Sequence, residues 1–475
     1  MARYLTTTLP YVNADPHVGF AVELVQADAL ARAWRLAGEE VFFSTGTDEH
    51  GQKIFQKAQE TGQDVQAYVD HYAAEFGKLR DALDLSYDHF IRTTDPAHME
   101  AAQELWKRCE ANGDIYKKKY RGLYCVGDEM FLRESDLVEG RCPNHPTMEP
   151  LEIEEENYFF ALSKYQQYLE EYLSEPSATL PEWRRHEALN FVRAGLDDIS
   201  ISREKARLSW GIPVPGDEEQ VMYVWFDALT NYLSTLGWPE DAEGRYKKFW
   251  EEGKTLQLAG KDQIRFQSVL WQAMLKSAGL PATDTVRYHG FVTSGGHKMS
   301  KSLGNVISPA EMVARYGTDA TRYMLLRHVH STEDTDITWE RMDEWYTANL
   351  VNGLGNLVAR VMKLAETHLP EPVAQEAEST LRADIHSALD SFEFNAALDR
   401  VWSEIGVIDQ HITETEPFKV VKTDQEKGRA LIAELVVRLA TVAEALAPFM
   451  PSTSETILSA IRENKKPENL FPRLS

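Results

Sequence analysis

Two lysines near residue 300 lie in a segment whose residue types suit phosphate chemistry. Residues 298–302 read KMSKS, so small and soft residues separate Lys298 from Lys301, and a Leu-Gly-Asn run follows. Lysine carries a compact charge on a flexible stem, which suits an anion that changes shape during a reaction. A basic pentapeptide alone is usually a solvated surface, so this one gains meaning from a second element upstream.

That second element is the turn around His17. Residues 15–20 read DPHVGF, at the point where an expected strand gives way to an expected helix. An imidazole and the N–H groups of a helix N-terminus can bind phosphate oxygens, and Gly19 allows a close approach. His17 alone would be a surface histidine in a loop. Together with the lysine segment it predicts ATP activation chemistry.

The elements that position this turn alternate between strand and helix. Residues 4–9 are β-branched and apolar, residues 21–37 carry apolar side chains near helical spacing, and residues 41–43 form a short apolar run. This order predicts a parallel βαβ unit, whose ligands bind outside the carboxyl ends of the strands. The polar segments 10–20 and 45–51 fall at such ends.

Further along, the pattern changes twice. Residues 116–215 are richer in loops and predict an inserted domain, after which the α/β pattern resumes near residue 222. From about residue 348, apolar side chains step by three and four and predict a helical bundle. The stripes are Leu350, Leu354, Leu357, Val361 and Leu364; Phe394, Leu398, Val401, Ile405, Ile408 and Ile412; and Leu435, Leu439, Val442 and Leu446.

The composition is that of a globular protein of two to four domains. The 475 residues are 43% hydrophobic and 26% charged, without an apolar run near the ~20 residues of a membrane span. The absence of a signal peptide and the presence of three cysteines predict a cytoplasmic protein without disulfides. A net charge of −25 weighs against diffuse attraction to nucleic acid but allows a local basic groove. The basic clusters at 117–121 and 184–185 are interpreted as solvated faces.

The two phosphate elements resemble the HIGH and KMSKS signatures of class I aminoacyl-tRNA synthetases. The surrounding motifs narrow the resemblance to the methionyl-tRNA synthetases, over nearly the whole chain. They are TLPYVN at 8–13, TGTDEHG at 45–51, YVWFDAL at 223–229, GKD at 260–262 and KMSKSLG at 298–304. As a set, in this order and spacing, the motifs are highly specific.

The resemblance implies an α/β fold with a Rossmann-like parallel sheet, an inserted connective domain that resembles a zinc knuckle, and a C-terminal α-helical bundle. The expected parts are the two catalytic halves at 1–115 and 218–297, the connective domain at 116–217, the KMSKS and stem-contact region at 298–347, and the anticodon-binding bundle at 348–475.

It also implies a two-step reaction in which methionine attacks the α-phosphate of ATP and a terminal tRNA hydroxyl then takes the methionyl group. Catalysis is placement plus charge stabilisation, usually with Mg²⁺, and needs no protein nucleophile. By resemblance, His17 and Gly19 contact the phosphates, while Lys298 and Lys301 stabilise pyrophosphate as it leaves. Asp262 is expected near the ribose and Arg203 near the rim of the site; their alternatives are a helix cap and a structural ion pair.

For L-methionine, the resemblance assigns Asp48 to the α-ammonium. The pocket and its lid are carried by Leu9, Tyr11, Trp225, Ala228, Tyr232, Gln267 and Trp271, whose aromatic members suit a polarizable sulfur. Without the family, any one of these aromatics could be plain core. The chain departs from the family pattern where Phe20 replaces a histidine, Gln267 replaces a pocket histidine, and Leu229 replaces a common proline. Phe20 removes one possible phosphate donor, which predicts slower adenylate formation or a different way of holding ATP. Gln267 can still form a hydrogen bond but changes the contact that would give selectivity.

The connective segment resembles the family's zinc knuckle with one ligand changed. Cys125 and Asp128, then Cys142 and His145, repeat a two-residue spacing. Carboxylate is a legitimate Zn²⁺ ligand, so the four could form a tetrahedral site. The alternative is a knuckle that holds no metal.

In the bundle, Asn356 and Arg360 lie one helical turn apart and match the residues that read the anticodon in the family. Phe418 stands where an aromatic ring stacks on an anticodon base. Their alternative role is capping and core packing. The expected partner is tRNA(Met), initiator tRNA included, and not a membrane. Because the chain lacks the C-terminal extension of some relatives, we expect a monomer.

Two other functions fit parts of the pattern. Another HIGH-type nucleotidyltransferase acting on a small acid would not need the bundle with Asn356 and Arg360. A catalytically weak relative that binds tRNA is compatible with Phe20 and Gln267. Methionine-dependent ATP–pyrophosphate exchange, followed by tRNA charging, separates all three.

Overall fold

The computed structural model divides the chain into two units, each with its own core. It describes residues 1–126, 130–132, 134, 137–143, 148–299, 304–373 and 380–474, with the backbone alone at 130, 131, 298 and 380. The first unit comprises Met1–Pro16, Glu39–Lys78 and Tyr87–Tyr288. The second comprises His17–Gly38, Leu79–Ser86 and His289–Ser475.

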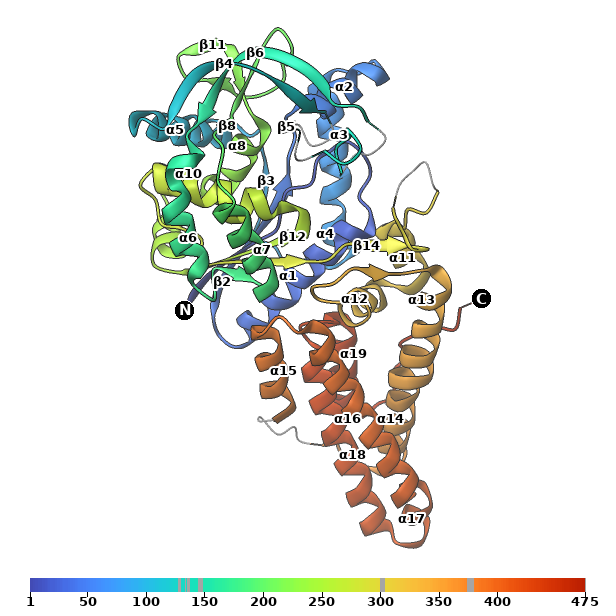
Figure 1. Cartoon of the computed structure of the whole chain (residues 1–475). Helices are drawn as coiled ribbons and strands as arrows, with labels where there is room; N and C mark the ends of the chain where they lie inside the picture. Colours follow the sequence, from blue (N-terminus) through green and yellow to red (C-terminus); the bar gives the residue numbers. More distant parts are fainter. Residues whose placement is uncertain are drawn as a thin grey trace. The chain divides into compact units, whose positions relative to one another are not determined.

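A six-stranded sheet in the order β3-β2-β1-β12-β13-β7 forms the centre of the first unit (Figure 1). The pairs β1–β2, β1–β12, β2–β3 and β13–β7 are parallel. The segments that follow β1, β2 and β12 therefore leave the sheet on the same side, at the carboxyl ends of the strands. Ligands bind there in such folds. The strands are β1 Ala2–Thr6, β2 Glu40–Thr47, β3 His89–Arg92, β7 Thr179–Leu180, β12 Lys254–Gly260 and β13 Thr285–His289.

Helices of the first unit bury large aromatic side chains against one another. Trp106, Phe226 and Trp271 are fully buried and belong to one continuous hydrophobic cluster. The α-helices are α2 Gln52–Thr61, α3 Val65–Gly77, α5 Pro96–Ala111, α6 Gln166–Ser174, α7 Glu182–Arg193, α8 Val224–Leu229, α9 Asn231–Ser234 and α10 Trp271–Ser277. Shorter 3₁₀ and π segments are η2 Leu162–Tyr165, η3 Lys247–Glu251, η4 Lys261–Gln263 and η5 Phe266–Leu270.

The inserted region is built on a long antiparallel ribbon of β4 (Ile115–Cys125) and β6 (Leu151–Phe160), seen at the top of Figure 1. Two basic residues of β4 pair with acidic residues of two other strands: Arg121 Nε lies 2.8 Å from Glu152 Oε1 of β6, and Lys117 Nζ lies 2.8 Å from Asp217 Oδ2 of β11. This pairing supports the interpretation of the 117–121 cluster as a solvated face. The other strands here are β5 Met130–Leu132, β8 Ile199–Ser200, β9 Ser202–Glu204, β10 Pro213–Val214 and β11 Asp217–Met222.

The second unit combines the first long helix of the chain with its C-terminal part. It contains α1 Val18–Leu36, α4 Leu79–Ala82, β14 Val292–Ser294, β15 His297–Lys298, β16 Thr335–Asp336, α11 Pro309–Tyr316 and α12 Thr318–Arg327. Gly295 and Gly296 both have positive φ and make the tight β14–β15 hairpin turn, which residues with a Cβ would resist. A Ser308–Glu311 capping box begins α11.

The helical bundle completes the second unit, with α14, α16 and α18 running along it and α17 at its far end (Figure 1). All members of the predicted stripes are buried except Leu364, which is half-buried. The elements are α13 Trp339–Trp345, η7 Tyr346–Gly355, α14 Asn356–His368, α15 Thr380–Asp390, α16 Phe394–Thr415, α17 Pro417–Thr423, α18 Gln425–Leu446 and α19 Pro451–Arg462.

The predicted fold class is confirmed, and the differences lie at the ends of elements. Strand β1 stops at Thr6, earlier than predicted, and pairing resumes at a bridge between Tyr11 and Asp48. The first helix begins at Val18, and the helices of the bundle begin with α13 at Trp339. The division into five parts stays a prediction. Among the described residues, every helix is too short or too polar to cross a membrane.

Candidate active site

The imidazole of His17 caps the first helix. Its Nδ1 accepts a hydrogen bond from the N–H of Gly19 at 3.1 Å. A Cβ at position 19 would lie 2.8 Å from the His17 ring, so this close approach requires glycine. Because Nδ1 accepts, a neutral ring carries its proton on Nε2, which can then donate to a phosphate oxygen. The adjacent helix N-terminus favours the same anion.

Phe20 packs on the ring of His17. The two ring centroids are 4.4 Å apart. The position that holds a second histidine in the family therefore supplies no polar group here, but it does restrict the His17 imidazole. This contact explains how a single histidine can keep a fixed orientation at the turn.

The structure brings the His17 turn and the flank of the lysine segment together. The N–H of Val18 donates to the carbonyl of Ile307 at 3.0 Å, within the second unit. Lys298 lies on β15 opposite Thr293, and Asn305 Nδ2 donates to the Ser294 carbonyl at 3.1 Å. Lys301 lies outside the described residues.

Asp48 follows the end of β2 and is 2% exposed. Its backbone N–H donates to the Pro10 carbonyl at 3.0 Å, and its carbonyl accepts from Val12 at 3.2 Å. Tyr11 forms the bridge opposite Asp48, and Leu9 is half-buried just before it. The predicted methionine-binding residues Leu9, Tyr11 and Asp48 therefore occupy adjoining turns at one edge of the sheet.

Glu49, the neighbour of Asp48, has a structural partner that the sequence did not reveal. Arg92 grips the fully buried Glu49 carboxylate with two hydrogen bonds of 2.7 and 2.8 Å, and Thr94 Oγ1 donates to it at 2.5 Å. The Glu49 N–H donates to Thr93 Oγ1 at 2.9 Å. Of the two consecutive carboxylates, Glu49 thus holds the turn in place.

Asp227 provides a second tie to this turn. Its Oδ2 lies 2.7 Å from His50 Nδ1, and its Oδ1 lies 2.8 Å from His98 Nε2, with all three side chains buried. Burial alone would raise the pKa of Asp227, but the charge and N–H groups of His50 and His98 hold it below its usual value. Ser234 Oγ lies 2.9 Å from His98 Nδ1, so both ring nitrogens of His98 have a hydrogen-bond partner.

The predicted pocket residues of the first unit form one hydrogen bond and two contacts between aromatic rings. Gln267 Nε2 donates to the Tyr232 hydroxyl at 2.5 Å, and the rings of Tyr232 and Trp271 have centroids 5.7 Å apart. Trp225 stacks on Phe266 at 4.1 Å, one helical turn before the buried Ala228.

Within the described part of the chain, Gln267 Oε1 and Trp271 Nε1 are buried without a hydrogen-bond partner. Buried polar atoms normally have a partner, so a polar ligand group or a water would complete them. The glutamine at the family's histidine position therefore still orders the pocket through Tyr232.

Two further residues predicted to bind ATP differ in exposure. Asp262 is exposed in the short turn after β12, at the carboxyl end of a central strand. Arg203 is 2% exposed, donates to the Ser202 carbonyl at 2.7 Å and lies over the rings of Tyr124 and Tyr223. Its surroundings are those of a packed residue, and its role toward ATP stays a prediction.

The described cysteines of the connective segment share a small core. Cys125, Cys142 and Leu132 are buried together, and none of the three cysteines of the chain forms a disulfide. Asp128 and His145 lie outside the described residues. Among those that are described, no group of three candidate ligands gathers as a metal would require.

The predicted anticodon residues lie on two helices of the bundle. Asn356 is exposed and begins α14, and Arg360, one turn later, forms an ion pair with Asp409 of α16. Phe418 is 40% exposed near the start of α17, with Lys419 Nζ 5.9 Å from its ring centroid. An exposed amide, a guanidinium and an exposed ring are the groups that recognise unstacked bases.

Known proteins are similar to this chain over nearly its whole length. The family model for class I tRNA synthetases (M) matches residues 3–150 and 146–362. A methionine–tRNA ligase of Thermotoga maritima is 40% identical over 98% of this chain and 76% of its own length, and one of Brucella suis biovar 1 is 39% identical over 96% and 91%. The structure of Mycobacterium tuberculosis methionyl-tRNA synthetase in complex with methionyl-adenylate aligns with a TM-score of 0.89 at 36% identity, covering 96% of this chain and 93% of that one.

Proposed function

We propose that this chain, which belongs to the methionyl-tRNA synthetase family of class I tRNA synthetases, activates L-methionine with ATP and transfers it to the 3′ end of tRNA(Met). The observation that carries the proposal is the hydrogen bond from Val18 to Ile307, which joins the His17 turn to the flank of the lysine segment. A helix N-terminus with an imidazole donor, bonded to the segment that follows two lysines, suits a triphosphate.

The first step is attack of the methionine carboxylate on the α-phosphate. A bond forms from the carboxylate oxygen to the α-phosphorus. The bond from that phosphorus to the oxygen that bridges to the β-phosphate breaks, and pyrophosphate leaves. His17 donates from Nε2 to a phosphate oxygen, and Lys298 and Lys301 offset the charge on the leaving group. Asp48, which is buried just after β2, holds the α-ammonium. Mg²⁺ bound to ATP would neutralise phosphate charge.

In the second step the terminal tRNA hydroxyl attacks the methionyl carbonyl, and the bond from the carbonyl carbon to the phosphate oxygen breaks. AMP leaves with the bonding electrons, and its phosphate takes up the hydroxyl proton. The proposed contribution of the protein is to orient the two substrates and exclude water. Asn356, Arg360 and Phe418 are proposed to bind the anticodon, initiator tRNA included. A cytoplasmic location and a monomeric state stay predictions from the sequence.

We also propose that the connective segment holds Zn²⁺. The thiols of Cys125 and Cys142 share one small buried cluster, and soft thiolates suit this ion. Asp128 and His145 are proposed to complete four ligands. Metal analysis should find about one zinc per chain, and a strong chelator should expose two thiols to a thiol reagent. Cys109 serves as the internal control, because burial raises its pKa to about 12 and keeps it unreactive.

The test of the main proposal is methionine-dependent ATP–pyrophosphate exchange by the purified chain, followed by charging of tRNA(Met). Both activities are expected. Exchange with another small acid but not methionine would favour a different nucleotidyltransferase. Binding of tRNA without any exchange would indicate a catalytically weak relative.

A further inference from the structure

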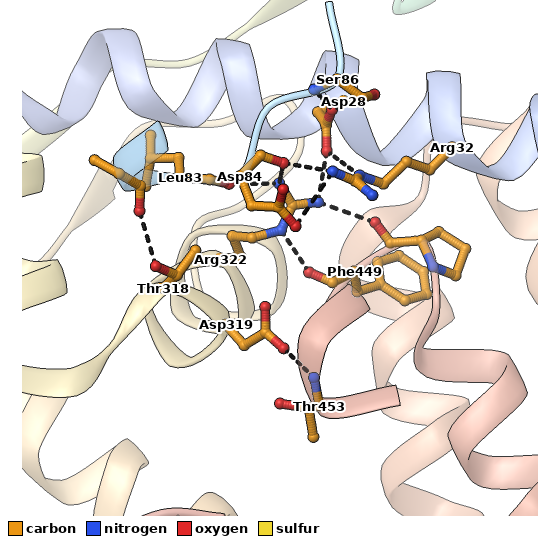
Figure 2. Close-up of polar contacts among 12 residues, drawn as sticks. Asp28, Arg32, Leu83, Asp84, Ser86, Thr318, Asp319, Arg322, Phe449 and Thr453 are labelled. Carbon is orange, nitrogen blue, oxygen red and sulfur yellow. Dashed lines mark hydrogen bonds and ion pairs between the residues drawn. The ribbon is translucent and has the colours of Figure 1, made fainter. Parts of the chain in front are cut away.

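One buried arginine joins three segments of the second unit. Arg322, on α12, is fully buried and directs its guanidinium at five acceptors, one of which is the Asp84 carbonyl, 3.4 Å from Nη1 (Figure 2). Its Nε donates to the Phe449 carbonyl at 2.8 Å, and its Nη1 donates to the Leu83 carbonyl at 2.9 Å. Its Nη2 donates to the Pro448 carbonyl at 3.1 Å and lies 2.8 Å from Asp28 Oδ2. Only arginine has donors in a fixed fork that can make such a set of bonds.

Asp28, on α1, is the charged partner and is equally buried. Oδ2 also accepts from Arg32 Nε at 2.7 Å, and Oδ1 accepts from the N–H and the hydroxyl of Ser86 at 2.6 and 2.7 Å. The carboxylate therefore has four hydrogen-bond or ion-pair contacts, and its orientation cannot change without loss of several of them.

The bundle side of this cluster is fixed as well. Pro448 and Phe449 lie between α18 and α19, and Asp319 of α12 accepts from the N–H of Thr453 at the start of α19 at 2.5 Å (Figure 2). Helix α12 thus holds the end of the bundle through backbone groups. Through Arg322 it also holds α1.

Helix α1 carries His17 at its N-terminus, about three helical turns before Asp28. Because a helix is stiff over this length, a slide or rotation of α1 at Asp28 moves His17 by a similar amount. The bond from Val18 to Ile307 fixes only the first turn.

We propose that Arg322 is a positioning residue for adenylate formation: by gripping Asp28 and the Pro448–Phe449 carbonyls, it sets α1, and with it His17, against the helical bundle. The inference rests on the proposed function. It makes the bundle part of the scaffold for the first step, which takes place without tRNA. The competing explanation is that Arg322 contributes only to the stability of the fold.

The test is Arg322→Lys, which keeps the charge but loses the fork. Exchange is measured without tRNA on protein shown to be folded. We expect kcat to fall about ten- to a hundredfold, because a displacement of a reacting group by about an ångström has an effect of this size. KM for methionine should stay unchanged. The matched control is Arg327→Lys: Arg327 lies on the same helix and bonds Asp399 of α16 at 2.9 Å, and this variant should keep wild-type kinetics.

A double-mutant cycle with His17→Ala decides whether the effect passes through His17. If it does, Arg322→Lys lowers kcat in the wild type but has little further effect in His17→Ala. Equal loss in both backgrounds, or a wild-type kcat per folded molecule, overturns the inference. If Arg322→Lys does not fold, Asp28→Asn replaces it with the same expectations. A wild-type chain without exchange would refute the proposed function itself, whereas an active wild type with an unaffected variant refutes only the role of Arg322.

Discussion

His50 Nδ1 lies 2.7 Å from Asp227 Oδ2, and the two buried residues come from segments far apart in the sequence. The bond ties α8, which carries Trp225 and Ala228, to the turn that carries Asp48. Two parts of the proposed methionine pocket are therefore held by one carboxylate.

Replacing that carboxylate should weaken methionine binding selectively. In Asp227→Asn the side chain keeps its shape, but its NH₂ group faces the N–H of one histidine. A buried donor then lacks an acceptor, which costs about 1–3 kcal/mol of free energy. We expect KM for methionine in the exchange assay to rise by about tenfold, with KM for ATP unchanged.

The matched control is Asp114→Asn, also a buried carboxylate of the first unit. It accepts from Ser277 Oγ at 2.8 Å and from Tyr165, and in the described part of the chain no hydrogen bond joins its side chain to residues 48–50. The control should lose stability but keep KM for methionine. Equal kinetic effects of both variants would show that Asp227 acts only through folding.

Asp48→Ala should abolish methionine-dependent exchange. When an α-ammonium in a buried pocket loses its carboxylate partner, the loss costs about 3–5 kcal/mol of binding free energy. The informative measurement compares methionine with its analogue that carries a hydroxyl in place of the ammonium. The wild type should strongly prefer methionine, whereas Asp48→Ala should bind the two with similar affinity. An unchanged preference would assign the ammonium to another residue.

The neighbouring acids at 48 and 49 show where sequence reasoning ends. The strand and helix pattern predicted the parallel sheet, and motif order placed Asp48 at its ligand edge. Nothing in the motif distinguishes Asp48 from Glu49, because the distinction depends on Arg92, which lies 43 residues away. For the same reason the pairing of Asp28 with Arg322 was missed. Buried ion pairs between distant segments leave no periodic signal in a sequence.

Two acids of the Arg322 cluster should respond oppositely to pH. Burial raises the pKa of Asp28, but the charges of Arg322 and Arg32 more than offset this and hold it below its usual value. Burial also raises the pKa of Asp319, and there the bonds from Thr453 do not reverse the shift. Stability linked to a lowered pKa is present above the unfolded value of about 3.9 and is lost as the pH falls below it.

Asp28→Asn should therefore be much less stable than the wild type at pH 7, and the difference in free energy of unfolding should shrink as the pH falls below about 4. For Asp319→Asn the sign is reversed. An acid with a raised pKa costs stability once it ionises. The free energy of unfolding of the wild type should therefore rise relative to that of Asp319→Asn as the pH falls from 7 towards 4. Urea unfolding at several pH values tests both. Parallel curves for the two variants would contradict the assignment.

Arg360→Ala should separate tRNA recognition from adenylate chemistry. Arg360 lies in the bundle on α14, and the residues proposed to act on ATP lie elsewhere in the sequence. Exchange should stay at the wild-type level, while charging of tRNA(Met) falls by the equivalent of about 1–3 kcal/mol, as for loss of one base contact.

The ion pair between Arg360 and Asp409 supplies the decisive control. If Arg360 only links α14 to α16, then Asp409→Asn removes the same link and should impair charging as much as Arg360→Ala does. If Arg360 contacts an anticodon base, Asp409→Asn should keep charging near normal, because the guanidinium remains. Arg438→Ala removes another bundle arginine, 3.3 Å from Glu434, and should leave both activities unchanged. With a net charge of −25, diffuse attraction cannot replace a lost specific contact, so the two explanations should differ clearly at physiological salt.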